Sequence, residues 1–301
     1  MISRRTLNKI IVAGLGLSST GVSAINLISK TIPQSNEVIP AIGMGTWITF
    51  DVNPTNNKLD NQLAILNEFF QGGGRMIDSS PMYGFAQKVL GIILPDVVGK
   101  EQLFSATKVW TMGQQNGIKQ MQESMQLWGL DQIDLMHVHN MLDWKTQLST
   151  LNQWKQKGII KHTGITTSHG RRHQELIAML KSNPVDFIQI SYNINEREAE
   201  NYLLPLAQDL GIAVVINRPF QTGGLFTRVG NQTLPDWAKE IQCKNRAQFF
   251  LKFVISHPAV TCAIPATSQV QHMQQNMQAM QGKLPDQKMR EEMIRYYESV
   301  T

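Results

Sequence analysis

The feature that most constrains the fold of this chain is a repeated alternation of short apolar segments with longer amphipathic ones. Eight apolar segments typical of buried strands lie at 42–47, 75–79, 103–109, 133–140, 161–166, 187–193, 213–219 and 261–267. Stretches with helical periodicity follow at 61–71, 85–94, 114–127, 144–156, 174–181, 198–210, 245–256 and 270–280, and a last one spans 287–299. Eight strand–helix units predict an α/β fold, a single-domain (β/α)8 TIM barrel.

Other architectures fit the sequence less well. A doubly wound sheet would need a glycine fingerprint that opens a helix after the first strand, and the segment 43–47 lacks the third glycine. The chain is 42% hydrophobic and 17% charged, which excludes global disorder. Cys243 and Cys262 are the only cysteines, so a disulfide framework and a zinc finger are excluded as well.

The first 24 residues are typical of a targeting segment. Arg4 and Arg5 precede a mildly apolar run, and Ala24 ends a stretch of small residues suited to cleavage. This pattern resembles a bacterial twin-arginine export signal, which implies the twin-arginine machinery as a partner and a periplasmic or otherwise exported protein. The alternative is an uncleaved membrane anchor at 10–28, but its Gly, Ser, Thr and Asn content disfavours a stable membrane span.

The division expected from this is a signal segment at 1–24, a polar linker at 25–37 and the barrel at 38–301. The net charge of +5 is concentrated in the signal segment. Because basic residues elsewhere are scattered, nucleic acid is not an expected partner.

Four residues with proton chemistry fall where barrel strands end. Asp78 ends the second strand and Tyr83 follows it, while Lys108 and His139 lie near the ends of the third and fourth strands. An ammonium beside a tyrosine stabilises its phenolate and lowers its pKa, and a carboxylate holds that ammonium in place. A neutral histidine can donate a hydrogen bond to a carbonyl oxygen. The set suits protonation of a carbonyl oxygen, with the hydride coming from a cofactor.

A metal-dependent barrel hydrolase is the competing interpretation, because His137 and His139 lie two residues apart on one strand. Such a site needs further ligands at later strand ends, where Arg218 and Thr267 stand instead, so no metal is expected. His137 is expected to be a hydrogen-bonded core histidine.

Five motifs in order resemble the aldo-keto reductase superfamily: 43–47, 77–84, 106–110, 133–140 and 264–268. The five-residue separations of Tyr83 from Asp78 and of His139 from Asp134 also match the pattern of that family. The resemblance implies an NAD(P)H-dependent oxidoreductase that reduces an aldehyde or ketone, or oxidises the alcohol. It assigns Asp78, Tyr83, Lys108 and His139 as the catalytic tetrad, with Tyr83 as the proton donor.

The resemblance also implies a nicotinamide site, with NADP(H) favoured over NAD(H), and a carbonyl pocket lined by Trp47 and Trp110. The cofactor-binding positions that it assigns are Gly45, Thr46, Thr166, Thr167, Gln189, Asn217, Arg218, Pro219, Phe220, Thr267, Ser268, His272 and Asn276.

Several of these positions depart from the family pattern. Asn217 stands where an aromatic ring stacks on the nicotinamide, and Phe220 is the nearest substitute. Ala266 and His272 stand where the family has Lys and Arg for the 2′-phosphate, so the residues themselves leave the choice between NADP and NAD open. These departures motivate an alternative function, a nicotinamide-binding sensor or partner barrel with little turnover.

Overall fold

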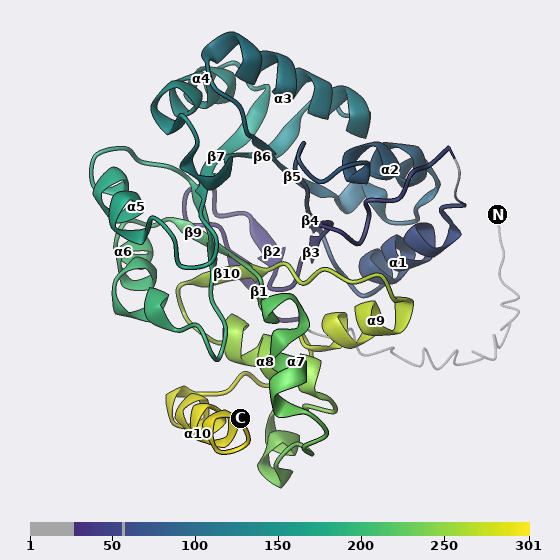
Figure 1. Ribbon diagram of the computed structural model, residues 1–301, viewed down its shortest axis with the longest axis vertical. Helices are drawn as coiled ribbons and strands as arrows, with labels where there is room; N and C mark the ends of the chain where they lie inside the picture. Colours follow the sequence, from purple (N-terminus) through teal and green to yellow (C-terminus); the bar gives the residue numbers. More distant parts are fainter. Residues whose placement is uncertain (1–26, 56–57) are drawn as a thin grey trace, which may run out of the picture.

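The computed structural model describes residues 27–55 and 58–301, and it confirms the (β/α)8 barrel (Figure 1). All eight strands are parallel and pair in chain order. Bridges from Ile42 to Ala263 and from Gly45 to Ala266 bring the first strand against the last. The barrel strands are β3 (Met44–Gly45), β4 (Met76–Asp78), β5 (Phe104–Val109), β6 (Ile133–Val138), β7 (Ile160–Thr166), β8 (Phe187–Ser191), β9 (Ala213–Asn217) and β10 (Val260–Ala263).

Helices surround this barrel, as Figure 1 shows in the view down its axis. They are α1 (Asp60–Gln71), α2 (Ala86–Ile93), α3 (Gln114–Trp128), α4 (Trp144–Gln156), α5 (His173–Leu180), α6 (Leu203–Asp209), α7 (Gly224–Val229), α8 (Arg246–Ile255), α9 (Val270–Gln278) and α10 (Gln287–Ser299). The helical periodicity did not predict α7, a six-residue helix in the connection between β9 and α8. Too short to show an apolar stripe, it carries no periodic signal.

Except for β7, the strands are shorter than the apolar segments that predicted them. The segment 133–140, for example, is strand only to Val138, and a 3-10 turn follows at His139–Met141. Asn140 has a φ of 51°, so the chain turns sharply just after His139. The chain therefore leaves the sheet where the expected site residues begin.

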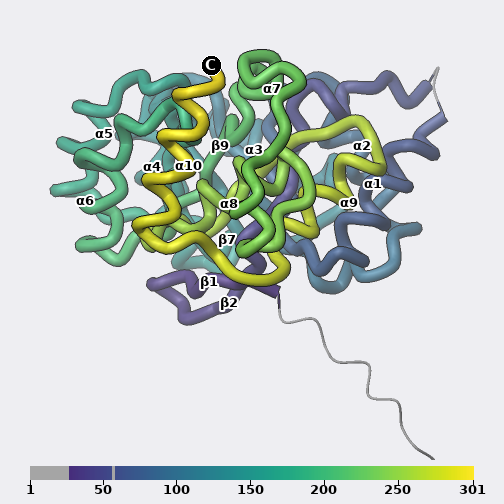
Figure 2. Tube along the Cα trace, turned by 90° about the horizontal axis from the view of Figure 1, so that it is seen from below, coloured from purple at the N-terminus to yellow at the C-terminus, as the bar shows by residue number. Residues whose placement is uncertain are grey.

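An antiparallel hairpin of β1 (Ser29–Thr31) and β2 (Val38–Pro40) precedes the barrel, and it corrects the linker expected at 25–37. Its Ile32 and Ile39 are fully buried and pack with Phe104 and Phe187 inside the barrel. Figure 2 shows the hairpin below the barrel, at the end opposite α7. The apolar residues flanking a polar turn explain why this segment folds, and the hairpin closes the N-terminal end of the barrel.

The signal segment expected at 1–24 lies outside the described residues. Within the described part, no helix is both long and apolar enough to cross a membrane. The C-terminal ends of the barrel strands carry buried polar side chains, among them Asp78, Lys108 and Gln189, instead of the apolar residues that fill the other end.

Candidate active site

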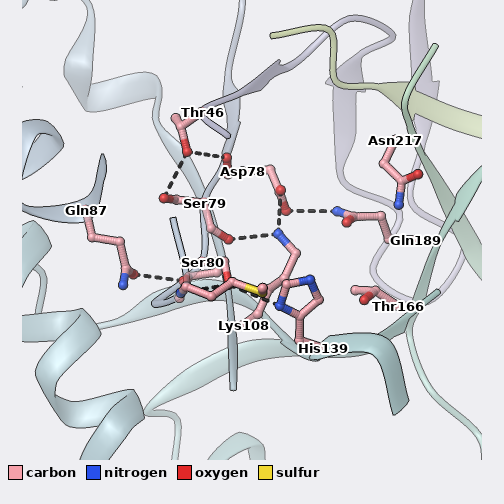
Figure 3. Close-up of polar contacts among 12 residues, drawn as sticks. Thr46, Asp78, Ser79, Ser80, Gln87, Lys108, His139, Thr166, Gln189 and Asn217 are labelled. Carbon is pink, nitrogen blue, oxygen red and sulfur yellow. Dashed lines mark hydrogen bonds and ion pairs between the residues drawn. The ribbon is translucent and has the colours of Figure 1, made fainter. Parts of the chain in front are cut away.

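A buried ion pair lies at the C-terminal end of the barrel. Nζ of Lys108, on β5, donates to Oδ2 of Asp78, on β4, at 2.5 Å, and to the backbone oxygen of Ser79 at 2.8 Å (Figure 3). The other carboxylate oxygen, Oδ1, accepts from Nε2 of Gln189 on β8 at 2.8 Å. Parallel strands thus deliver three side chains that are far apart in the sequence to one point.

Burial and the pairing act against each other on the pKa values of this pair. Burial raises the pKa of Asp78, and Lys108 and Gln189 oppose that rise. Burial on its own lowers the pKa of Lys108, but Asp78 and Tyr83 raise it, and the net shift is upward. Lys108 is therefore held as an ammonium ion inside the barrel.

Tyr83 lies in the turn after β4, where its N–H donates to the backbone oxygen of Ser80 at 3.0 Å. Nζ of Lys108 lies 5.1 Å from the centroid of its ring. Burial raises the pKa of Tyr83 more than Lys108 lowers it. The expectation that the ammonium would bring this pKa below its ordinary value is therefore wrong for the protein alone, because burial penalises the phenolate.

His139 lies next to Tyr83 and is held from two sides. Its Nδ1 is 3.1 Å from Oγ of Ser80, and its ring lies 6.1 Å from the ring of Tyr83. The following peptide is fixed by the hydroxyl of Thr166, which accepts from N–H of Asn140 at 2.9 Å. Burial, followed by the nearby Lys108, lowers the pKa of His139 to about 3, so the ring is neutral at ordinary pH.

Ser80 was not among the residues expected at the site. Its signal in the sequence is weak, since it is one of two adjacent serines between Asp78 and Tyr83. The two serines separate in the structure: the hydroxyl of Ser79 contacts Thr46 at 2.9 Å, and that of Ser80 faces His139.

The expectation of a hydrogen-bonded His137 is also wrong. The side chain is fully buried, yet neither ring nitrogen has a partner among residues 27–55 and 58–301. A Cβ at Gly164 would lie 2.3 Å from its Nδ1, so the ring packs directly against the glycine backbone of β7. Burial and the charge of Lys108 place the pKa of His137 well below its usual value.

A polar group lies beside the ion pair, at the ends of β7, β8 and β9. Ser191 donates to Oδ1 of Asn217 at 2.6 Å, and Nδ2 of Asn217 donates to the backbone oxygen of Thr167 at 3.0 Å. The hydroxyl of Thr167 is buried and has no partner within the described part of the chain. Thr46 instead points into the barrel wall, where it donates to the backbone oxygen of Asp78.

The other expected cofactor positions occupy the connections after β9 and β10. Arg218 has a φ of 52°, its Nη1 donates to Thr222 at 3.1 Å, and its Nε is buried without a partner in the described chain. The ring of Phe220 packs on Phe226, with their centroids 5.0 Å apart.

The remaining positions divide by exposure. Buried are Gly45, Pro219, Thr267 and Asn276, and exposed are Ser268 and His272.

Trp47 and Trp110 are 43% and 41% exposed, and the ring of Trp110 lies 6.4 Å from that of His139. Further exposed apolar side chains stand on the connections that carry these two tryptophans, after β3 and β5, and on the connection after β4, which lies between them in the chain. We call this set the apolar rim; its members are Trp47, Ile48, Met82, Phe85, Trp110 and Met112. Of these six residues only the two tryptophans were expected from the sequence, because single apolar residues in loops carry no periodic signal.

A barrel that gathers a buried ammonium, a tyrosine and a neutral histidine at the C-terminal ends of its strands has the arrangement of an oxidoreductase that acts on carbonyl groups. The chain belongs to the Aldo/keto reductase family, which matches it over residues 41–292. It is therefore an NAD(P)-dependent oxidoreductase that interconverts carbonyl and alcohol groups.

Named relatives are similar over most of their length. "Methylglyoxal reductase YeaE" of Escherichia coli is 27% identical over 263 residues, which cover 85% of this chain and 90% of the relative. An "NADH-specific methylglyoxal reductase" of the same organism is 26% identical and is covered over 73% of its length, against 70% of this chain. A Klebsiella pneumoniae aldo-keto reductase solved with NADPH superposes with a TM-score of 0.74 at 22% identity, covering 90% of this chain and 96% of its own.

Proposed function

We propose that this enzyme reduces an aldehyde or ketone with NADP(H), or catalyses the reverse reaction, and that Tyr83 is its proton donor. The observation that carries the assignment of roles is the contact of Lys108 with both Asp78 and the ring of Tyr83. As negative charge grows on the carbonyl oxygen, Tyr83 gives its proton to that oxygen, and the ammonium of Lys108 stabilises the phenolate left behind. Asp78 holds the ammonium in place.

His139 orients the carbonyl in this proposal. Because its pKa is about 3, the imidazole is neutral and can donate one hydrogen bond to the oxygen without competing for the proton of Tyr83. Trp110 lies beside it and covers the apolar part of the substrate.

Residues at the C-terminal ends of β7, β8 and β9 fit a nicotinamide cofactor, which supplies the hydride when bound. The hydroxyl of Thr167, unpartnered in the described chain, and Oε1 of Gln189 are suited to a carboxamide, because it offers both an acceptor and a donor. The buried Nε of Arg218 suits a phosphate oxygen. Asn217 replaces a stacking ring by an amide held in two hydrogen bonds, so this face of the site is polar.

NADP(H) is favoured over NAD(H) by two solved structures similar to this chain, one determined in complex with NADPH and the other in complex with NADP. The NADH-specific relative argues for testing both. Titration of the protein with each nucleotide, followed by tryptophan fluorescence, tests the cofactor site through Trp47 and Trp110. We expect saturable quenching with NADPH at lower concentration than with NADH; no response to either would refute the assigned site.

Turnover is then measured with a panel of aldehydes. Methylglyoxal belongs in it because two relatives are named as its reductases, and apolar aldehydes belong in it because of the apolar rim. Steady consumption of NADPH that depends on the aldehyde supports the reductase. Tight nucleotide binding with no turnover of any carbonyl would favour the sensor or partner barrel instead.

We further propose that the twin-arginine segment exports the folded enzyme to the periplasm with its cofactor already bound, and that cleavage follows Ala24. The support is the pair Arg4 and Arg5 ahead of a weakly apolar run. Cell fractionation tests this: replacement of both arginines by lysine should retain the protein in the cytoplasm. Export unaffected by that change would contradict the twin-arginine route. An exported form purified without nucleotide would contradict export with the cofactor bound.

A further inference from the structure

The contact between Ser80 and His139 bears on a question that the assignment of roles leaves open, namely which ring nitrogen carries the proton. A neutral imidazole has one N–H donor and one acceptor nitrogen, and only the donor can serve a carbonyl oxygen. Nδ1 of His139 lies 3.1 Å from Oγ of Ser80, as the dashed line in Figure 3 marks. Within the described chain no group is hydrogen-bonded to Nε2.

The hydrogen bonds of Ser80 decide the direction of this contact. The side chain is fully buried, so its hydroxyl hydrogen has no access to bulk water. Its oxygen already accepts from N–H of Met82 at 3.4 Å, and because that N–H is a donor it cannot accept the hydroxyl hydrogen. Among the described residues the acceptor within reach of the hydroxyl hydrogen is Nδ1 of His139. Donation in this direction leaves neither group unsatisfied.

The ring is also fixed through the backbone that follows it. Thr166 accepts from N–H of Asn140, and Nη1 of Arg172 donates to the backbone oxygen of Asn140 at 2.7 Å. These two bonds hold the two successive peptide bonds that follow His139. The ring itself is buried and contacts the rings of Tyr83 and Trp110, so a turn that exchanges its two nitrogens would have to displace these neighbours. Burial, and after it the nearby charge of Lys108, disfavours the imidazolium, so the choice lies between two neutral tautomers.

We propose that Ser80 is a positioning residue whose hydroxyl donates to Nδ1 of His139 and thereby keeps the proton of the ring on Nε2. That proton is the one offered to the carbonyl oxygen. The tautomer itself is independent of turnover, whereas its kinetic consequence rests on the proposed function.

Nitrogen-15 NMR of histidine-labelled protein reads the tautomer directly, without substrate. The chain has seven histidines, and the signals of His139 are identified by their loss in His139→Gln. We expect Nδ1 of His139 to show the shift of an unprotonated ring nitrogen and Nε2 that of an N–H, unchanged between about pH 5 and pH 8 because the ring does not titrate there. A proton found on Nδ1 would overturn the proposal, and this result needs no variant.

Ser80→Ala tests the consequence. It should give a mixture of the two tautomers in the same spectrum and lower kcat by about tenfold, since part of one transition-state hydrogen bond is lost. KM and the Kd of NADPH should stay within about twofold. Ser80→Thr keeps the hydroxyl and should restore both the spectrum and kcat.

The matched control is Ser124→Ala, which removes the hydroxyl of a buried serine on α3 that has no partner in the described chain. It should leave the spectrum of His139 and kcat as they are. An unaltered tautomer in folded Ser80→Ala would overturn the proposal. Wild-type protein without carbonyl turnover would instead overturn the proposed function, while the tautomer remained readable.

Discussion

Nζ of Lys108 and Oδ2 of Asp78 are 2.5 Å apart, and both side chains are almost completely shielded from solvent. Two opposite charges buried together are costly to desolvate, and their mutual attraction offsets that cost only while both are present. Removal of one member should therefore cost more stability than removal of both.

Removal of one member should destabilise the fold. Asp78→Asn leaves the ammonium without its counter-charge, and Lys108→Met leaves the carboxylate without its own, so each should lower the free energy of unfolding by about 3–5 kcal/mol. The double variant should recover part of this loss while remaining inactive. Urea unfolding measures all three. Lys161→Ala, which removes a half-exposed partner of Asp134, should cost less than about 1 kcal/mol; single variants no less stable than the double would contradict the argument.

Tyr83→Phe should lower kcat for carbonyl reduction by about 10²–10⁴-fold, the usual contribution of a general acid. The change removes only the hydroxyl and keeps the ring beside Lys108, so the Kd of NADPH should stay within about threefold. Stopped-flow and equilibrium fluorescence separate the two quantities. A variant that retains its kcat would remove Tyr83 from the proposed mechanism.

The pH dependence follows from the same residue. Burial raises the pKa of Tyr83, so the phenol keeps its proton at neutral pH and is ready to donate it. Reduction should therefore lose little rate between about pH 6 and pH 9 and decline only above the ordinary tyrosine pKa of about 10. An inflection near pH 6.5 would mean that His139 titrates instead, contrary to its lowered pKa.

Acid should weaken the fold through the same histidine. The pKa of His139 is about 3 in the folded chain, against the ordinary histidine value of 6.5, so the unfolded chain binds the extra proton between these two pH values. Above pH 6.5 the ring is neutral in both states and costs the fold nothing. As the pH falls from 6.5 toward 3, protonation of the unfolded chain lowers the free energy of unfolding, by roughly 2 kcal/mol at pH 5. His139→Gln should lose less stability than wild type between pH 7 and pH 5 in urea unfolding. Ser124→Ala should lose as much as wild type; an equal loss in all three would exclude this source.

The sequence predicted the barrel because each of the eight units shows a short apolar segment followed by a stretch with helical periodicity. The convergence of Asp78, Lys108 and His139 followed from their places at strand ends, since parallel strands end on one side of a barrel. Ser80, Arg172 and the four members of the apolar rim other than the tryptophans were beyond reach, because they depend on how loops with positive φ angles turn, as at Asn140. The pKa of Tyr83 was mispredicted because neighbouring charges can be named from sequence whereas the degree of burial cannot.

Thr166 and Thr167 are adjacent, yet only one of their hydroxyls is hydrogen-bonded within the described chain. Substitution of each in turn therefore tests the cofactor site. The hydroxyl of Thr166 accepts from N–H of Asn140, whereas that of Thr167 is buried with no partner in the described chain. Thr167→Val removes an unsatisfied group and should leave the free energy of unfolding unchanged or raise it by up to about 2 kcal/mol. If this hydroxyl is kept for a nicotinamide carboxamide, the same change should weaken NADPH binding by about three- to tenfold.

Thr166→Val is the matched control for that prediction. It leaves N–H of Asn140 without its acceptor and should lower the free energy of unfolding by about 1–3 kcal/mol. Urea unfolding and NADPH titration of both variants give the comparison. Thr167→Val that loses stability without losing affinity would show that its hydroxyl serves the fold, and the carboxamide would then have to be held by Gln189 and its neighbours alone.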